Sequence, residues 1–201
     1  PLGCRPRRAG GGTVVVFPSF GEETSRGFYL RDAGLYFVIG DYFDIAVTGD
    51  IYTLGSWALD FNSRYKVNYK LNGNFSLTFS NDQSGEKGSS DFRQSRNFGV
   101  RWTHSQDAKA RPGTSFSASV NFSSPSNSKY NSTSVTEALQ NQISSSISYS
   151  KNWNGKMNLS INALHNQNSK DSSYTFTLPN VTFSVSRFSP FKTKNRVGNE
   201  K

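Results

Sequence analysis

Residues 56–71 read SWALDFNSRYKVNYKL, and apolar and polar side chains alternate along this stretch. The odd positions carry Trp57, Leu59, Phe61, Ser63, Tyr65, Val67, Tyr69 and Leu71, whereas the even positions carry Ser56, Ala58, Asp60, Asn62, Arg64, Lys66, Asn68 and Lys70. A period of two residues puts the two sets on opposite faces of one sheet. The stretch therefore predicts a long β-strand with one apolar and one polar face.

The same alternation returns along the chain, between clusters of Gly, Asn, Asp, Ser and Pro. The further segments are 45–52, 74–80, 92–104, 114–122, 139–150, 156–164 and 174–187. In the last segment the apolar positions change from even to odd after Leu178-Pro179-Asn180. Proline cannot donate a ladder hydrogen bond, so a bulge is predicted there. We expect an all-β fold, an antiparallel meander of about nine long strands.

Composition limits what kind of sheet this is. The chain has 201 residues, of which 34% are hydrophobic, and no apolar run reaches the length of a transmembrane helix. Low average hydropathy still fits a membrane β-barrel, because a barrel strand shows lipid only at every second residue. The long strands favour an incomplete segment of a large transmembrane β-barrel. The alternatives are a soluble or surface β-sandwich that binds carbohydrate, and an unrelated porin or receptor barrel.

Residues that carry chemistry are scarce. Neither His104 nor His165 belongs to a catalytic or metal-binding motif, and the single cysteine, Cys4, excludes an internal disulfide framework and a multi-cysteine zinc site. The net charge is +9, but the aromatic and most of the basic side chains fall on opposite strand faces, which disfavours a nucleic-acid platform. We predict no enzymatic activity, no catalytic residues, no cofactor, no metal and no nucleic-acid partner.

A group of motifs lies between residues 17 and 57. They are Phe17-Pro18-Ser19-Phe20-Gly21, Arg26-Gly27-Phe28-Tyr29-Leu30, Gly34-Leu35-Tyr36-Phe37, Asp41-Tyr42-Phe43-Asp44, Gly49-Asp50-Ile51-Tyr52 and Gly55-Ser56-Trp57. This stretch resembles the start of the barrel in the family of the LPS-assembly protein LptD (OstA/Imp), in its Bacteroidetes-type form. Residues 1–12 are rich in Pro, Arg and Gly and are expected to be a flexible or artefactual tail. The resemblance implies a possible last strand of a periplasmic jellyroll with its linker at 13–20, and the N-terminal portion of the outer-membrane barrel at 21–201.

The resemblance also implies a function. Members of the family transport lipopolysaccharide and insert it into the outer leaflet of the Gram-negative outer membrane. Implied partners are lipopolysaccharide, outer-membrane lipid, an LptE-like plug lipoprotein and periplasmic bridge proteins. A lateral gate is implied near Pro18, Phe28 and Leu30, because a proline weakens the pairing of an edge strand. The alternative is that Pro18 only ends a jellyroll strand.

Strand parity suggests which charged side chains face the barrel lumen. These candidates are Asp60, Arg64, Lys66, Lys70, Arg93 and Arg101. The basic ones are suited to the phosphates and acidic sugars of lipopolysaccharide, although solvation of a polar lumen explains them equally well.

The direction of the strands leaves one inconsistency. If the chain enters from the periplasm and the strands are 27–39, 41–52, 56–69 and 74–81, the long loop at 82–91 is periplasmic. Long barrel loops are expected outside the cell. Either a strand is miscounted within 27–52, or the loop rule fails for this chain.

Overall fold

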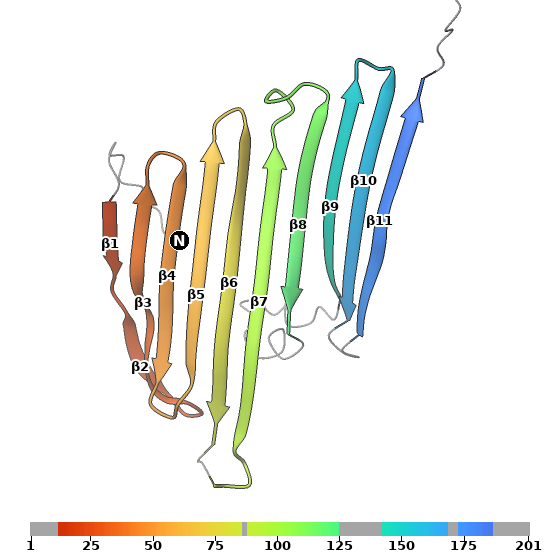
Figure 1. Ribbon diagram of the computed structural model, residues 1–201. Helices are drawn as coiled ribbons and strands as arrows, with labels where there is room; N and C mark the ends of the chain where they lie inside the picture. The colour runs from red at the N-terminus through yellow and green to blue at the C-terminus, as the bar shows by residue number, and fades with distance from the viewer. Residues whose placement is uncertain (1–11, 86–87, 125–141, 169–172, 187–201) are drawn as a thin grey trace, which may run out of the picture.

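The computed structural model describes residues 12–85, 88–124, 142–168 and 173–186, which form one antiparallel sheet (Figure 1). The strands are β1 (Gly12–Val16), β2 (Ser19–Glu23), β3 (Gly27–Ile39), β4 (Phe43–Tyr52), β5 (Trp57–Val67), β6 (Leu71–Ser84), β7 (Arg93–Gln106), β8 (Thr114–Ser123), β9 (Gln142–Trp153), β10 (Met157–Asn168) and β11 (Ser173–Val185). From β3 to β11 each strand pairs with the next in sequence, and β1 and β2 both pair with β3.

This arrangement confirms the predicted all-β meander. The described residues form a single open sheet, not the two packed sheets that a β-sandwich requires. An open meander of long strands is what a segment of a larger barrel looks like. Among these residues, no helix is long and apolar enough to span a bilayer.

Register alignment carries the predicted faces from strand to strand. Phe61 of β5 lies opposite Val47 of β4 and Leu77 of β6, whereas its neighbour Asp60 lies opposite Thr48 and Thr78. Residues that face each other across antiparallel strands point to the same side. The sheet therefore has an apolar face, which contains Phe61, and a polar face, which contains Asp60.

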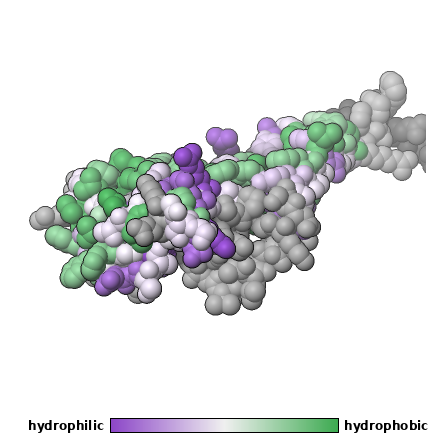
Figure 2. Space-filling view, turned by 90° about the horizontal axis from the view of Figure 1, so that it is seen from below, coloured by the Kyte–Doolittle hydropathy of each residue, from purple (hydrophilic) through white to green (hydrophobic). Residues whose placement is uncertain are grey.

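The apolar face is largely uncovered. Among the described residues, the only hydrophobic side chains that reach full burial are Tyr52, Ala118 and Ile143. Large side chains of the apolar face stay exposed in strands far apart, including Leu30, Ile51, Leu59, Phe79 and Phe183. Figure 2, seen from the lower end of the sheet, shows hydrophobic surface gathered over the first strands at the left. An apolar face that stays uncovered over many strands marks contact with lipid or protein.

One predicted strand boundary is wrong. This strand was expected to end at residue 69 and the next to begin at residue 74, but β5 ends at Val67 and residues 68–70 form a hairpin turn. The Lys70 N–H donates to the Val67 carbonyl, and Tyr69 adopts a positive φ of 59°. Leu71 already belongs to β6 and lies opposite Val67, so the period continued across the turn. Lys70 consequently lies in the turn and not on a strand face.

The predicted bulge in the last strand is confirmed. Asn180 pairs with Asn162 and Thr177 pairs with Leu164, so Leu178 and Pro179 together face Ala163 alone. The extra residue explains why the apolar positions of β11 change parity at this point.

The connections differ between the two ends of the sheet (Figure 1). The turns 40–42, 68–70, 107–113 and 154–156 lie at the upper end, and the turns 24–26 and 53–56 lie at the lower end. The two widest gaps between consecutive strands in the sequence, from Ser84 to Arg93 and from Ser123 to Gln142, are both flanked by strand ends at the lower end.

The proposed miscount within 27–52 is wrong, since β3 and β4 lie where they were expected. The missed strand is β2, which comes before residue 27 and continues the direction of β1 down the sheet edge. Of the predicted tail 1–12, only Gly12 is described, as the first residue of β1, and Cys4 lies outside the described residues.

Candidate functional site

The first edge of the sheet is a strand in two pieces. β1 pairs with the upper half of β3, from Gly34 to Val38, and β2 pairs with the lower half, from Gly27 to Arg31. Phe17 and Pro18 lie between the two pieces and pair with nothing in β3. Because Pro18 has no backbone N–H, the ladder is interrupted there.

A bulge on β3 lies at the same level as this break. Leu30 pairs with Ile51 and Ala33 pairs with Gly49, so Arg31 and Asp32 together face Asp50. Asp32 takes a positive φ of 61°, and its N–H donates to the Asp50 carboxylate at 2.8 Å instead of to the ladder. Regular pairing is thus lost at one level on both sides of β3.

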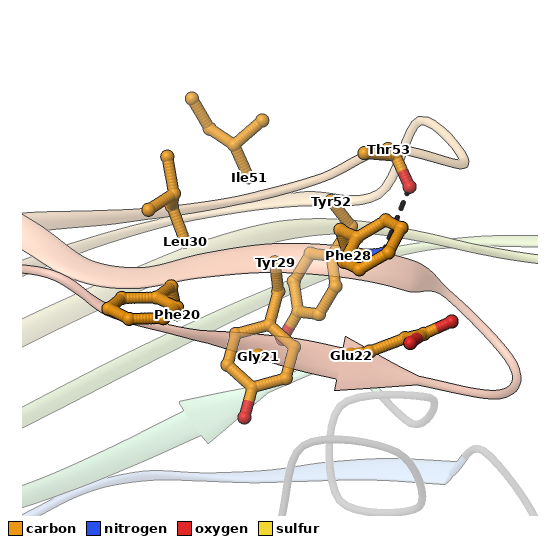
Figure 3. A pocket seen from close by; sticks show the side chains of 9 residues that line it. All are labelled: Phe20, Gly21, Glu22, Phe28, Tyr29, Leu30, Ile51, Tyr52 and Thr53. Atoms are coloured by element: carbon orange, nitrogen blue, oxygen red, sulfur yellow. Dashed lines mark hydrogen bonds between the residues drawn. The ribbon is translucent and has the colours of Figure 1, made fainter.

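An apolar groove lies just below this level, on the apolar face of β2, β3 and β4 (Figure 3). Its volume is about 510 Å³, and its apolar lining includes Phe20, Phe28, Leu30 and Ile51. These side chains are between 48% and 85% exposed. The predicted gate residues Phe28 and Leu30 therefore meet in one groove, and Pro18 lies in the edge break beside it.

On the polar face, the same strands carry a cluster of charged and aromatic side chains. It consists of Glu23, Arg26, Arg31, Tyr52 and Asp82, and it is called the edge cluster below. Arg31 binds the Glu23 carboxylate at 2.7 Å and donates from Nε to the Tyr52 hydroxyl at 2.7 Å. Arg26 contacts Glu23 at 3.2 Å and Asp82 of β6 at 3.3 Å. The cluster thus links the edge to a strand that is not its neighbour.

A family model described as LptD protein matches residues 1–201, the whole chain. The chain belongs to the LptD protein family. No curated protein matches it. Members of the LptD family act in lipopolysaccharide transport and assembly, which is not an enzymatic activity.

Most of the LptD lumenal candidates lie on the polar face. Register places Asp60, Arg64 and Lys66 there on β5, and Arg93 and Arg101 there on β7. Arg64, Lys66, Arg93 and Arg101 are exposed, whereas Asp60 is half-buried and accepts a hydrogen bond from Thr78 Oγ1 at 2.7 Å. Lys70 is separated from this set by its place in the turn. These residues do not form one pocket. They lie along a surface that extends from β5 to β7.

The two histidines of this LptD chain lie on the apolar face among aromatic rings. His104 Nδ1 is 2.7 Å from the Tyr65 hydroxyl, which also accepts a hydrogen bond from the Trp102 indole. His165 is buried beside Phe176, with ring centroids 4.5 Å apart. Neither stands next to a set of metal ligands, since the described residues hold no group of three or more His, Cys, Asp or Glu side chains suited to a metal ion.

Sequence reasoning missed several residues of the site. Phe20 was within reach of it, because Phe20 belongs to the motif that carries the LptD resemblance and pairs with Leu30. Ile51 was also within reach, as a member of an alternating segment next to the first strand. The edge cluster had no signal in the sequence, because Arg26 and Asp82 are 56 residues apart and belong to strands that are not neighbours.

Proposed function

We propose that this chain is the N-terminal part of a Bacteroidetes-type LptD barrel, which transports lipopolysaccharide and inserts it into the outer leaflet of the Gram-negative outer membrane. The observation that carries the proposal is the uncovered apolar face of a single sheet, in a chain that matches the LptD family over its whole length. A soluble sheet would have to bury this face against a second layer. Lipid covers it in a barrel.

The positions of the connections support an orientation. Long loops of outer-membrane barrels are extracellular and short turns are periplasmic. We assign the lower end, where β6 and β8 end and β7 and β9 begin, to the cell surface and the upper end to the periplasm. The chain then enters β1 from the periplasm, as the resemblance implies. The earlier inconsistency disappears because β1 and β2 together make one crossing before β3.

The same observation bears on the domain boundaries. Residues 12–16 and 19–23 pair with β3 along most of its length, on either side of the break at Phe17 and Pro18. This supports assigning them to the first barrel strand, in place of the jellyroll strand and linker expected at 13–20. Residues 21–201 remain barrel in either assignment.

We place the lateral gate at the broken edge, with Pro18, Phe28 and Leu30 as its residues and Phe20 and Ile51 added to its lining. An edge that must part from a neighbouring strand should be weakly paired, and Pro18 removes a ladder donor there. The groove below it offers apolar side chains to acyl chains on the lipid side. The lipopolysaccharide head group would meet the opposite, polar face at the same edge.

Charged residues of the polar face are proposed to accompany the head group. Arg64, Lys66, Arg93 and Arg101 are exposed there, and guanidinium and ammonium groups bind phosphate well. Asp60 takes part as a hydrogen-bond acceptor, and Lys70 extends the basic surface at the turn. An LptE-like plug lipoprotein and the periplasmic bridge proteins are proposed as protein partners on family grounds, together with outer-membrane lipid.

A photo-crosslinking experiment tests the proposal. The full-length protein with its plug lipoprotein is placed in liposomes of phospholipid alone, and the bridge proteins supply lipopolysaccharide on the periplasmic side. A photoreactive residue replaces Leu30 at the edge or Phe79 in β6, which are 48% and 43% exposed on the same face. We expect lipopolysaccharide adducts at position 30 before position 79. Equal rates would contradict the gate, and a product found only in the soluble fraction would overturn the barrel.

A further inference from the structure

We infer that the edge cluster acts as a brace. It attaches β2, the lower half of the edge strand, to the rest of the sheet, so that β2 stays in place while β1, the upper half, can separate. The inference rests on the proposed function only in calling this edge a gate. It concerns which part of that gate moves and which part stays fixed.

The brace has a firm attachment point on β6. Asp82 Oδ2 accepts hydrogen bonds from Asn97 Nδ2 at 2.7 Å and from Ser80 Oγ at 3.0 Å. Asn97 and Ser80 are only 3% and 5% exposed. Buried, hydrogen-bonded groups of this kind hold the carboxylate in one position. The other oxygen of Asp82 remains for Arg26.

Arg26 connects this point to the edge. It lies in the turn between β2 and β3, and its guanidinium carbon is 4.6 Å from the centroid of the Tyr52 ring. One end of the guanidinium contacts Glu23 and the other contacts Asp82. Arginine can bridge two carboxylates over an aromatic ring because its charge is spread over a planar fork. The β2–β3 turn is therefore tied to β6 across β4 and β5.

Arg31 adds a second connection. It binds Glu23, donates to the Tyr52 hydroxyl, and lies 4.0 Å from the centroid of the Tyr29 ring. Tyr52 is only 6% exposed, so this bond is shielded from water. Glu23, the last residue of β2, is thus held by two arginines. Its displacement would leave both guanidinium groups without this partner.

Within the described part of the chain, the upper half of the edge has no such attachment. β1 reads GTVVV and carries no charged residue, so it cannot form ion pairs. Val14 and Val15 are 47% and 56% exposed, and β1 is joined to β3 by backbone pairing. Few buried contacts mean a low free energy of local opening.

The two halves are also mechanically separate. Phe17 and Pro18 interrupt the edge, and the Arg31–Asp32 bulge interrupts the pairing of β3 with β4 at the same level. A displacement of β1 is therefore not passed along a continuous ladder to β2. We expect the gate to part in its upper half while the brace keeps the lower half in place.

Hydrogen exchange on the full-length protein in lipid nanodiscs, read by mass spectrometry, tests the brace. In the wild type, the amides of β1 should exchange faster than those of β2. The Asp82→Asn variant keeps the size of the side chain and removes its charge. We expect it to raise exchange in β2 roughly fivefold, because a partly shielded charged pair is lost, and to leave β1 unchanged.

Asp91→Asn is the matched control, since it makes the same change at an exposed carboxylate in the connection between β6 and β7, outside the brace. It should leave exchange in β2 unchanged. If Asp82→Asn fails to give a heat-modifiable barrel, Arg26→Gln tests the same connection from its other end. Equal protection of β1 and β2 in the wild type would overturn the inference. So would a β2 segment that is insensitive to loss of the Arg26–Asp82 pair.

This measurement needs no lipopolysaccharide, so the two proposals fail separately. A wrong brace leaves the crosslinks at Leu30 unaffected. A wrong transport function leaves the exchange pattern of β1 and β2 as expected here.

Discussion

The polar face of β2 to β7 and the polar face of β8 to β11 satisfy their polar groups in different ways. The first carries charged side chains, among them Glu23, Arg31, Asp60, Asp82 and Arg101. The second carries Ser115, Ser117, Ser119 and Asn121 on β8, Ser144, Ser146, Ser148 and Ser150 on β9, and Asn158, Ser160, Asn162, Asn166 and Asn168 on β10. Register places no charged residue on this second face.

The contacts follow from this difference. Ser115 and Ser150 lie 2.7 Å apart through their hydroxyl oxygens, and Ser117 and Ser148 lie 2.8 Å apart, so each pair joins only adjacent strands. Arg26 and Asp82 instead join elements separated by other strands. Long charged side chains therefore connect non-adjacent elements in the first half, whereas the short hydroxyls of the uncharged second half connect only neighbouring strands.

The largest effect is expected from filling the space under an aromatic ring of the first half. A Cβ at Gly21 would lie 2.5 Å from the Tyr29 hydroxyl and 2.7 Å from its ring carbon Cζ. Gly21→Val should displace this ring from the Arg31 guanidinium, 4.0 Å from its centroid, and from the Tyr52 ring, and should lower the free energy of unfolding by about 2 kcal/mol. Urea titration, followed by the heat-modifiable gel shift of the full-length barrel, measures this loss.

Gly12→Val is the control for that substitution. Gly12 is also in the edge strand, but a Cβ there meets nothing within 4 Å. Its unfolding midpoint should stay at the wild-type value. Equal losses in both variants would mean that the edge strand is sensitive to any added side chain, and not to the packing of Tyr29.

A smaller effect is expected from removing one hydroxyl in each half. Thr78→Val removes the hydrogen bond to the half-buried Asp60 carboxylate and should lower the free energy of unfolding by about 1.5 kcal/mol. Ser117→Ala removes an exposed hydroxyl pair with Ser148 and should lower it by about 0.5 kcal/mol. The same urea titration compares the two. A larger loss for Ser117→Ala would reverse the contrast between the two faces.

The smallest effect is expected from adding a charge to the hydroxyl-lined half. Ser146 is exposed on the polar face of β9, so a lysine there stays in water. Ser146→Lys should change the free energy of unfolding by less than about 0.5 kcal/mol. A loss above about 2 kcal/mol in the isolated barrel would show that this face is covered, and would contradict its description as a solvated surface.

The sequence predicted the long strands because their two faces differ along their whole length. It missed β2, where SFGEE places Phe20 and Glu22 on the same face and so breaks the alternation. It also put the turn at 68–70 a few residues too late in the sequence, since Tyr69 and Leu71 continue the period of β5 through a hairpin. Periodicity identifies a face, but it does not identify a turn whose residues happen to keep the period.

In the candidate site, too, some residues could be predicted from the sequence and others could not. Pro18, Phe28 and Leu30 were predicted through the family resemblance, and the structure groups Phe28 and Leu30 in one groove. The ion pair between Arg26 and Asp82 joins a turn of the edge to β6, with β4 and β5 between them in the sheet. Only the pairing of the whole sheet brings these two residues together, so no local pattern in the sequence predicts that pair.

The bulges at Arg31–Asp32 and at Leu178–Pro179 have a consequence for the dimensions of a closed barrel. Each inserts one residue into the register between neighbouring strands. The register offsets summed around a barrel give its shear number, which together with the strand number sets the strand tilt and the diameter of the pore. Deleting a residue from either bulge would therefore change the strand tilt and the diameter of the closed barrel, even though each bulge involves only two neighbouring strands.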